Sequence, residues 1–147
     1  MTAPGDTALR RLVVAVITQY AGPDADGEAL AAAARRAYED LARVSTPLIG
    51  AMGLDALTAR AVHLAGREHL WLADTREPGP TDGAFGAVVI RVRQRGDPEA
   101  AVDGAAAVLV RLGGLLVALI GQGLTWRLLR QAWPPGLPGE HEQEADT

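Results

Sequence analysis

The histidines are the side chains whose type and spacing come nearest to a catalytic or metal-binding group. His63 and His69 stand six residues apart on a predicted helix, with Glu68 beside His69. Metal-binding histidine pairs on helices are three or four residues apart, because that spacing places both rings on one face. Six residues turn a helix by about 240°, so the two rings point in different directions. The spacing therefore predicts no metal site.

His63 has basic neighbours that favour a different chemistry, the transfer of a phosphoryl group. Arg60 precedes it by three residues and Arg67 follows it by four. Guanidinium groups stabilise phosphate beside an imidazole nucleophile. The run from His63 to Gly66 resembles the histidine phosphotransfer domains of bacterial phosphorelays, although Arg67 stands one step later than the basic residue of that family. The resemblance implies an alternative function in which His63 accepts the phosphoryl group and Arg60 and Arg67 bind it.

The composition excludes several kinds of enzyme. The chain contains no cysteine and no lysine, since all 14 basic residues are arginine. Thiolate nucleophiles, cysteine-based metal sites, Schiff-base lysines and phosphate-loop lysines are therefore absent. Ser45 and Thr46 precede Pro47, a setting more typical of helix capping than of a nucleophile. We expect no catalytic residue, no cofactor and a protein that is not an enzyme.

The charge distribution limits the partners. The net charge is −4, and the acidic residues Glu140, Glu142, Glu144 and Asp146 stand near the end of the chain, so the remainder is close to neutral. Nucleic-acid binding requires a concentrated basic surface, and we expect none. The first residues lack the basic and apolar regions of a signal peptide. Together with an Ala-, Arg- and Gly-rich composition, this predicts a bacterial, cytoplasmic protein.

The strongest structural signal is a predicted helix over residues 98–133. Apolar residues recur at steps of three and four along two of its faces, and one stripe includes Leu112, Leu115 and Leu119. A helix with two apolar faces must be surrounded by other helices. The most apolar stretch, residues 112–124, has about 13 residues, fewer than the roughly 20 of a membrane span. We expect no membrane partner, and a membrane-active effector remains the weakest alternative.

Small residues on the third face of this predicted helix indicate a contact surface. Gly114, Ala118 and Gly121 recur at steps of four and three and form a groove that another backbone can enter. The contact is packing within one chain, a seam between two copies or the approach of a ligand, and a two-fold homodimer is the commonest assembly. Arg111 on the same face requires a carboxylate partner. The candidates on other helices are Glu39, Asp40 and Glu68.

The rest of the chain predicts further helices. They are expected over residues 7–20, 26–44 and 55–74, with a short turn over residues 47–52 that begins at Pro47. The second of these helices is expected to begin near Asp26, and Asp55 is expected to cap the third. Residues 84–95 fit a helix or a strand, and we favour a helix because a lone strand leaves its backbone unpaired.

These observations predict an all-α fold, a bundle of four or five helices with the apolar C-terminal helix at its centre. The bundle is expected to form a single domain over residues 1–133, and residues 134–147 a disordered Pro- and Gly-rich acidic tail. Apolar helical surface exceeds what such a bundle hides. We therefore expect a non-enzymatic interaction or regulatory module that binds another protein, including a copy of itself as a homodimer.

Overall fold

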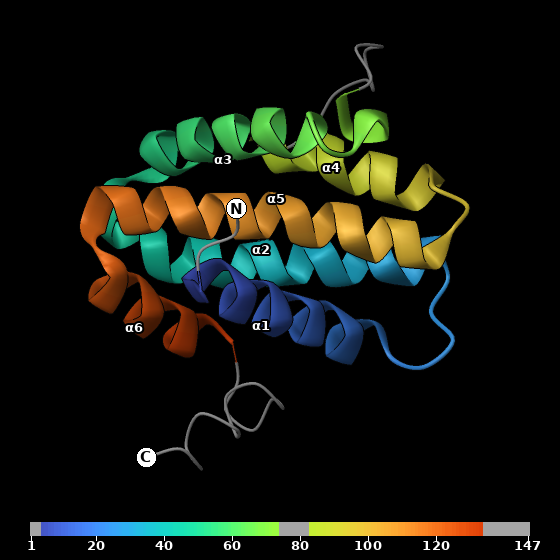
Figure 1. Cartoon of the computed structure of the whole chain (residues 1–147), viewed down its shortest axis with the longest axis horizontal. Coiled ribbons are helices and arrows are strands. Elements are labelled where there is room, and N and C mark those ends of the chain that lie inside the picture. Colours follow the sequence, from blue (N-terminus) through green and yellow to red (C-terminus); the bar gives the residue numbers. More distant parts are fainter. Residues whose placement is uncertain (1–3, 74–82, 134–147) are drawn as a thin grey trace.

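A computed structural model of the chain describes residues 4–73 and 83–133, which form six α-helices and one short 3₁₀ helix (Figure 1). They are α1 (Pro4–Ala21), α2 (Gly27–Ile49), α3 (Ala51–Gly66), η1 (Leu70–Ala73), α4 (Gly83–Gln94), α5 (Pro98–Ile120) and α6 (Gln122–Ala132). These two stretches contain no strand, which confirms the all-α prediction. The segment over residues 84–95, where a helix was favoured over a strand, is helical. The predicted tail over residues 134–147 lies outside the described residues.

The predicted C-terminal helix is divided in two at Gly121, which gives six helices where four or five were expected. Gly121 has φ +93°, a left-handed conformation that glycine adopts at little cost. Its N–H donates to the carbonyl of Val117 and closes α5, and its own carbonyl accepts from Thr125 at the start of α6. The apolar periodicity continues across the break, so the pattern alone does not reveal it. The Trp133 indole N–H donates to the Ala37 carbonyl at 3.1 Å and fastens the end of α6 to α2.

The boundary between α2 and α3 also differs from the prediction. α2 continues through Pro47 to Ile49, so the expected turn over residues 47–52 is wrong. The chain turns instead at Gly50, whose φ of +82° can end a helix where Pro47 alone does not. Asp55 lies inside α3, and its carboxylate accepts the N–H of Ala84 at the start of α4. It therefore caps a helix that is distant in sequence.

Two of the predicted helix starts are confirmed. The Asp26 carboxylate accepts the N–H of Ala29 at 2.9 Å and caps α2. Asp97 accepts the N–H of Glu99 at 3.1 Å, and Pro98 opens α5. A carboxylate in this position satisfies amides that have no partner within the helix.

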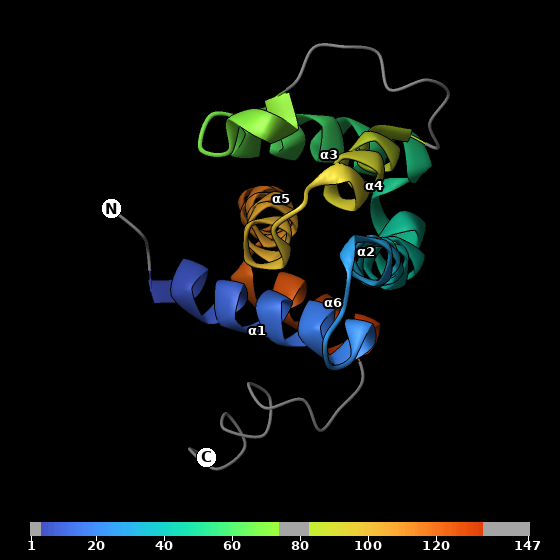
Figure 2. The same ribbon diagram turned by 90° about the vertical axis from the view of Figure 1, so that its right-hand side faces the viewer.

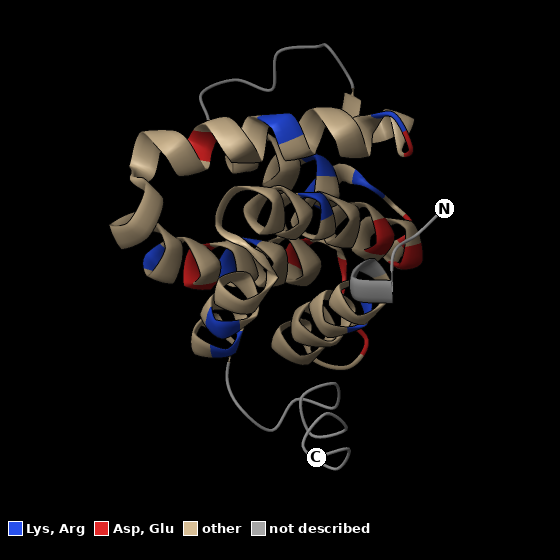
Figure 3. Cartoon of the chain, turned by 60° about the vertical axis from the view of Figure 1, so that its left-hand side comes forward, with Lys and Arg blue, Asp and Glu red and all other residues tan. Residues whose placement is uncertain are grey.

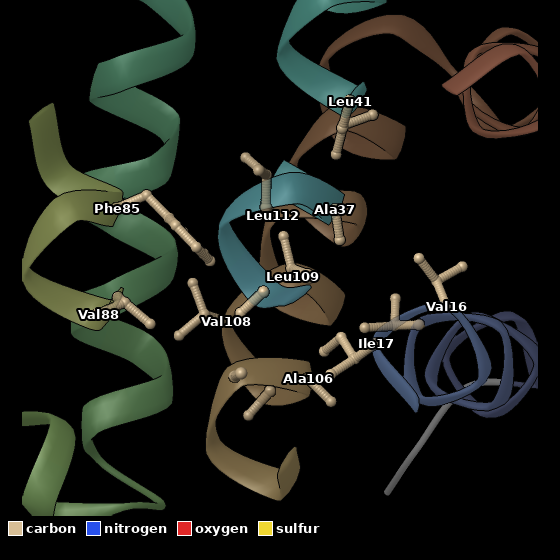
Figure 4. Packing of buried hydrophobic residues seen from close by; sticks show 14 of the residues in the cluster. Val16, Ile17, Ala37, Leu41, Phe85, Val88, Ala106, Val108, Leu109 and Leu112 are labelled. Carbon is tan, nitrogen blue, oxygen red and sulfur yellow. The ribbon is translucent and has the colours of Figure 1, made fainter. Parts of the chain in front are cut away.

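α5 lies in the middle of the fold and contacts every other α-helix (Figure 2). The close view in Figure 4 shows Val108 directed towards Phe85 and Val88 of α4, with Ile17 of α1 on the opposite side of α5. Leu112 is fully buried. The prediction of a central C-terminal helix is confirmed for α5. α5 is also long and apolar enough to cross a membrane, but half of its most apolar window is buried by its neighbours, as in a core helix.

Candidate functional site

The C-terminal half of α5 has one face that the other described helices leave open. A Cβ atom added at Gly114 would meet nothing within 4 Å, and the same holds at Gly121. Ala118, between them, is exposed. We call these three residues the α5 strip. Ala118 and Gly121 are therefore exposed and Gly114 is half-buried, and the packing inside the chain does not require either glycine to be small.

Other glycines of α5 provide the close packing. A Cβ at Gly104 would collide with the ring of Trp71, and one at Gly113 would lie 2.5 Å from Cδ2 of Leu9. The small residues that the fold needs therefore lie on faces of α5 that meet η1 and α1. This contrast separates the α5 strip from the glycines whose size the bundle itself explains.

Leucines beside the α5 strip extend the apolar surface. Leu119 is 58% exposed and Leu115 is partly buried. The prediction that Leu119 shares the buried stripe of Leu112 is therefore wrong. Leu119 is exposed because it lies in the last turn of α5, two turns beyond Leu112, where the helices that cover Leu112 no longer cover this face.

The end of the bundle where α2 meets α3 and α5 meets α6 carries no charge. Residues 44–54 and 112–126 contain no Arg, Lys, Asp or Glu, and both junctions lie at the same end of the bundle (Figures 1 and 3). Met52 is 89% exposed there and Leu48 50% exposed. We call Leu48, Met52 and Leu119 the apolar tip.

An ion pair borders the α5 strip. Arg111 pairs with Glu68, one of its three predicted partners, and both side chains are partly exposed. Asp40, another candidate, instead accepts the hydroxyl of Tyr20 at 2.7 Å and lies 3.6 Å from Arg43. The guanidinium of Arg111 is therefore a surface charge at the edge of the strip and not a buried charge that needs a ligand.

The side chains of His63, Glu68 and His69 do not form a common site. His63 is exposed on the outer face of α3, and Arg60 and Arg67 are exposed one turn to either side. Glu68 is engaged by Arg111, and within the described residues no three His, Asp or Glu side chains could hold a metal. Gly66 is buried, and a Cβ atom added there would lie 3.0 Å from the Cβ of Ala73, so its small size serves the packing of η1.

Two tyrosines have perturbed acidity, and both are structural. Burial and the hydrogen bond to Asp40 raise the pKa of Tyr20 to about 12. Burial also raises the pKa of Tyr38, although its hydroxyl lies 3.1 Å from that of Thr58, a contact that lowers it. Both phenols therefore stay protonated at neutral pH. Neither is suited to act as a general base.

Leu48 and Met52 were not predicted as site residues, although the sequence contains a signal for them. The uncharged run over residues 44–54 includes Pro47 and Gly50, and apolar side chains beside a turn have few neighbours to cover them. Comparisons with protein-family models, with curated proteins and with solved structures give no match to this chain, so its function is argued from the α5 strip, the apolar tip and His63.

Proposed function

We propose that this protein is a non-enzymatic helical interaction module and that it binds a second copy of itself. The observation that carries the proposal is the open α5 strip of Gly114, Ala118 and Gly121. Small side chains let a second helix approach closely, and the partly buried Leu115 beside them offers apolar area. The same proposal places the protein in the bacterial cytoplasm. The chain has no cysteine and therefore no disulfide that would require an oxidising compartment.

A two-fold homodimer suits the shape of this surface. A two-fold axis sets the same patch of each copy against itself, so the patch must be complementary to itself in shape and charge. The α5 strip is uncharged and its side chains are small, so two copies can face each other without like charges in contact. Arg111 lies at the edge of the strip and its charge is balanced by Glu68 within the same chain.

The variant Ala118→Glu tests the proposal. Two glutamates brought together across a two-fold axis repel each other, and we expect the dimer to weaken by roughly a hundredfold. Size-exclusion chromatography with light scattering should show a dimer for the wild type and a monomer for the variant. The helical circular dichroism should not change, because Ala118 is exposed.

Ala32→Glu is the matched control. Ala32 is also exposed, but it lies in the first half of α2, away from the α5 strip. We expect this variant to remain a dimer. A wild-type protein that is monomeric at high micromolar concentration, or a control that dissociates as readily as Ala118→Glu, would contradict the proposal.

The exposure of His63 favours a second candidate, phosphoryl transfer. Arg60 lies one turn before His63 in α3 and Arg67 is the residue that follows the end of the helix, so an anion on the imidazole would have a guanidinium group about one turn away on either side. Incubation with a small-molecule phosphodonor should then give an acid-labile phosphoryl adduct by mass spectrometry. His63→Gln should abolish the adduct and His69→Gln should leave it intact. An adduct that survives His63→Gln would exclude this candidate.

A further inference from the structure

We propose that the apolar tip inserts among the headgroups of an anionic lipid bilayer, so that this end of the bundle docks on a membrane surface. The tip consists of Leu48 in the last turn of α2, Met52 in the first turn of α3 and Leu119 in the last turn of α5. This inference goes beyond the proposed self-association, which concerns the open face of α5. It also revises the expectation from sequence that a membrane is no partner.

The exposure of the tip residues suits insertion into a bilayer. These residues stand next to two tight junctions, at Gly50 and Gly121, where the chain reverses at the end of the bundle (Figure 1). Met52 is almost completely exposed. Exposed apolar side chains at the end of a bundle can enter the boundary between headgroups and acyl chains without requiring a complementary pocket.

The cost of placing this end in a membrane interface is small. The uncharged segments over residues 44–54 and 112–126 bring no ionised group with them. The backbone of the two junction glycines is already paired, because the N–H groups of Gly50 and Gly121 donate to carbonyls of the helices they end. Their own carbonyls accept from Leu54 and Thr125 in the helices that follow. The two glycines therefore bring no unpaired backbone group of their own to the interface, whereas the first N–H groups of α3 and α6 have no side-chain cap and must stay at the level of the hydrated headgroups.

The charges behind the tip are suited to anionic headgroups. The first charged residues beyond the uncharged segments are Arg43, Asp55, Arg111 and Arg127, of which Arg43 and Arg111 pair with Asp40 and Glu68. Asp55 uses its carboxylate to cap α4, whereas α6 carries Arg127 and Arg130 and no acidic residue. Arginine side chains extend from an apolar stem to place their charge among phosphates, and each basic residue near an anionic surface adds to the attraction.

The structure limits the depth of insertion. α5 remains the central helix, and half of its most apolar window is covered by neighbouring helices. Only the exposed side chains at the two junctions can therefore enter the bilayer. The contact is therefore interfacial, and the bundle stays folded on the membrane surface without a helix that crosses it.

Flotation with lipid vesicles tests the proposal on the full chain. We expect the wild type to float with vesicles of phosphatidylcholine and phosphatidylglycerol, more weakly with phosphatidylcholine alone, and less in high salt. Met52→Glu should lower the partition coefficient by roughly tenfold or more, because a carboxylate replaces an inserted apolar side chain. The fold should not change, because Met52 makes little contact with the core.

Leu70→Glu is the matched control. Leu70 is 78% exposed in η1, which follows the end of α3 that lies away from the tip (Figure 1). This variant should float like the wild type. The proposal is overturned if the wild type does not float with either vesicle, or if both glutamate variants lose binding equally. It is also overturned if Met52→Glu leaves flotation unchanged but lowers the mass measured by light scattering, because a second copy would then cover the tip.

Discussion

Leu112→Ala is expected to lower the free energy of unfolding by about 2–5 kcal/mol, whereas Leu119→Ala is expected to change it by less than about 0.5 kcal/mol. Both residues lie on one apolar stripe of α5, two turns apart. Leu112 is fully buried, so its truncation loses transfer free energy and leaves a cavity. Leu119 keeps most of its surface in water, and its truncation removes few contacts.

Urea denaturation followed by circular dichroism measures both variants, and an unchanged dependence on urea would show that the unfolding transition stays the same. The pair controls for residue type, because each variant replaces leucine by alanine in the same helix. Equal losses of stability would mean that Leu119 is covered in solution. The loss would then depend on protein concentration if a second copy is the cover.

The central position of α5 could be predicted from sequence because a helix that is apolar on two faces has few alternatives. The sequence could not show at which residue of α5 the buried stripe ends. Leu112 and Leu119 have the same periodicity, and which of them is buried depends on how far the neighbouring helices extend. Periodicity describes one helix, whereas burial depends on the lengths and positions of several.

The helix boundaries show the same division between local and distant causes. Asp26 caps the helix that begins beside it, and this could be predicted from adjacent residues. Asp55 caps α4, which begins 28 residues later, and no local pattern indicates that. Pro47 was given too much weight and Gly50 too little, because the turn requires a positive φ that only the glycine provides cheaply.

The candidate site was only partly predictable. Gly114 and Ala118 were expected at a contact surface, and the partner of Arg111 was among three named carboxylates. Met52 was not expected, because the predicted turn over residues 47–52 left its surroundings undefined. Met52 is exposed in the first turn of α3, because this helix begins directly after Gly50, one turn earlier than the start predicted at Asp55.

Gly104→Ala and Gly114→Ala are expected to change stability in opposite directions, although both add one methyl group to the same helix. A Cβ at Gly104 would overlap the six-membered ring of Trp71, with Cη2 only 2.8 Å away. The ring or η1 must then move, and overpacking of this kind costs about 1–3 kcal/mol. At Gly114 the methyl group meets nothing within the chain, so the higher helix propensity of alanine should stabilise the monomer by about 0.5–1 kcal/mol.

A double-mutant cycle with Trp71→Ala identifies the cause of the loss at Gly104. Trp71→Ala alone should be destabilising, because the ring packs against α5 and the guanidinium of Arg95 lies 5.5 Å from its centre. With the ring removed, Gly104→Ala has nothing to collide with and should be neutral or stabilising, like Gly114→Ala. The coupling free energy from denaturation of the four proteins measures the collision. Additive effects of the two substitutions would mean that Trp71 does not lie over Gly104 in solution, and η1 would then have to be placed elsewhere on the bundle.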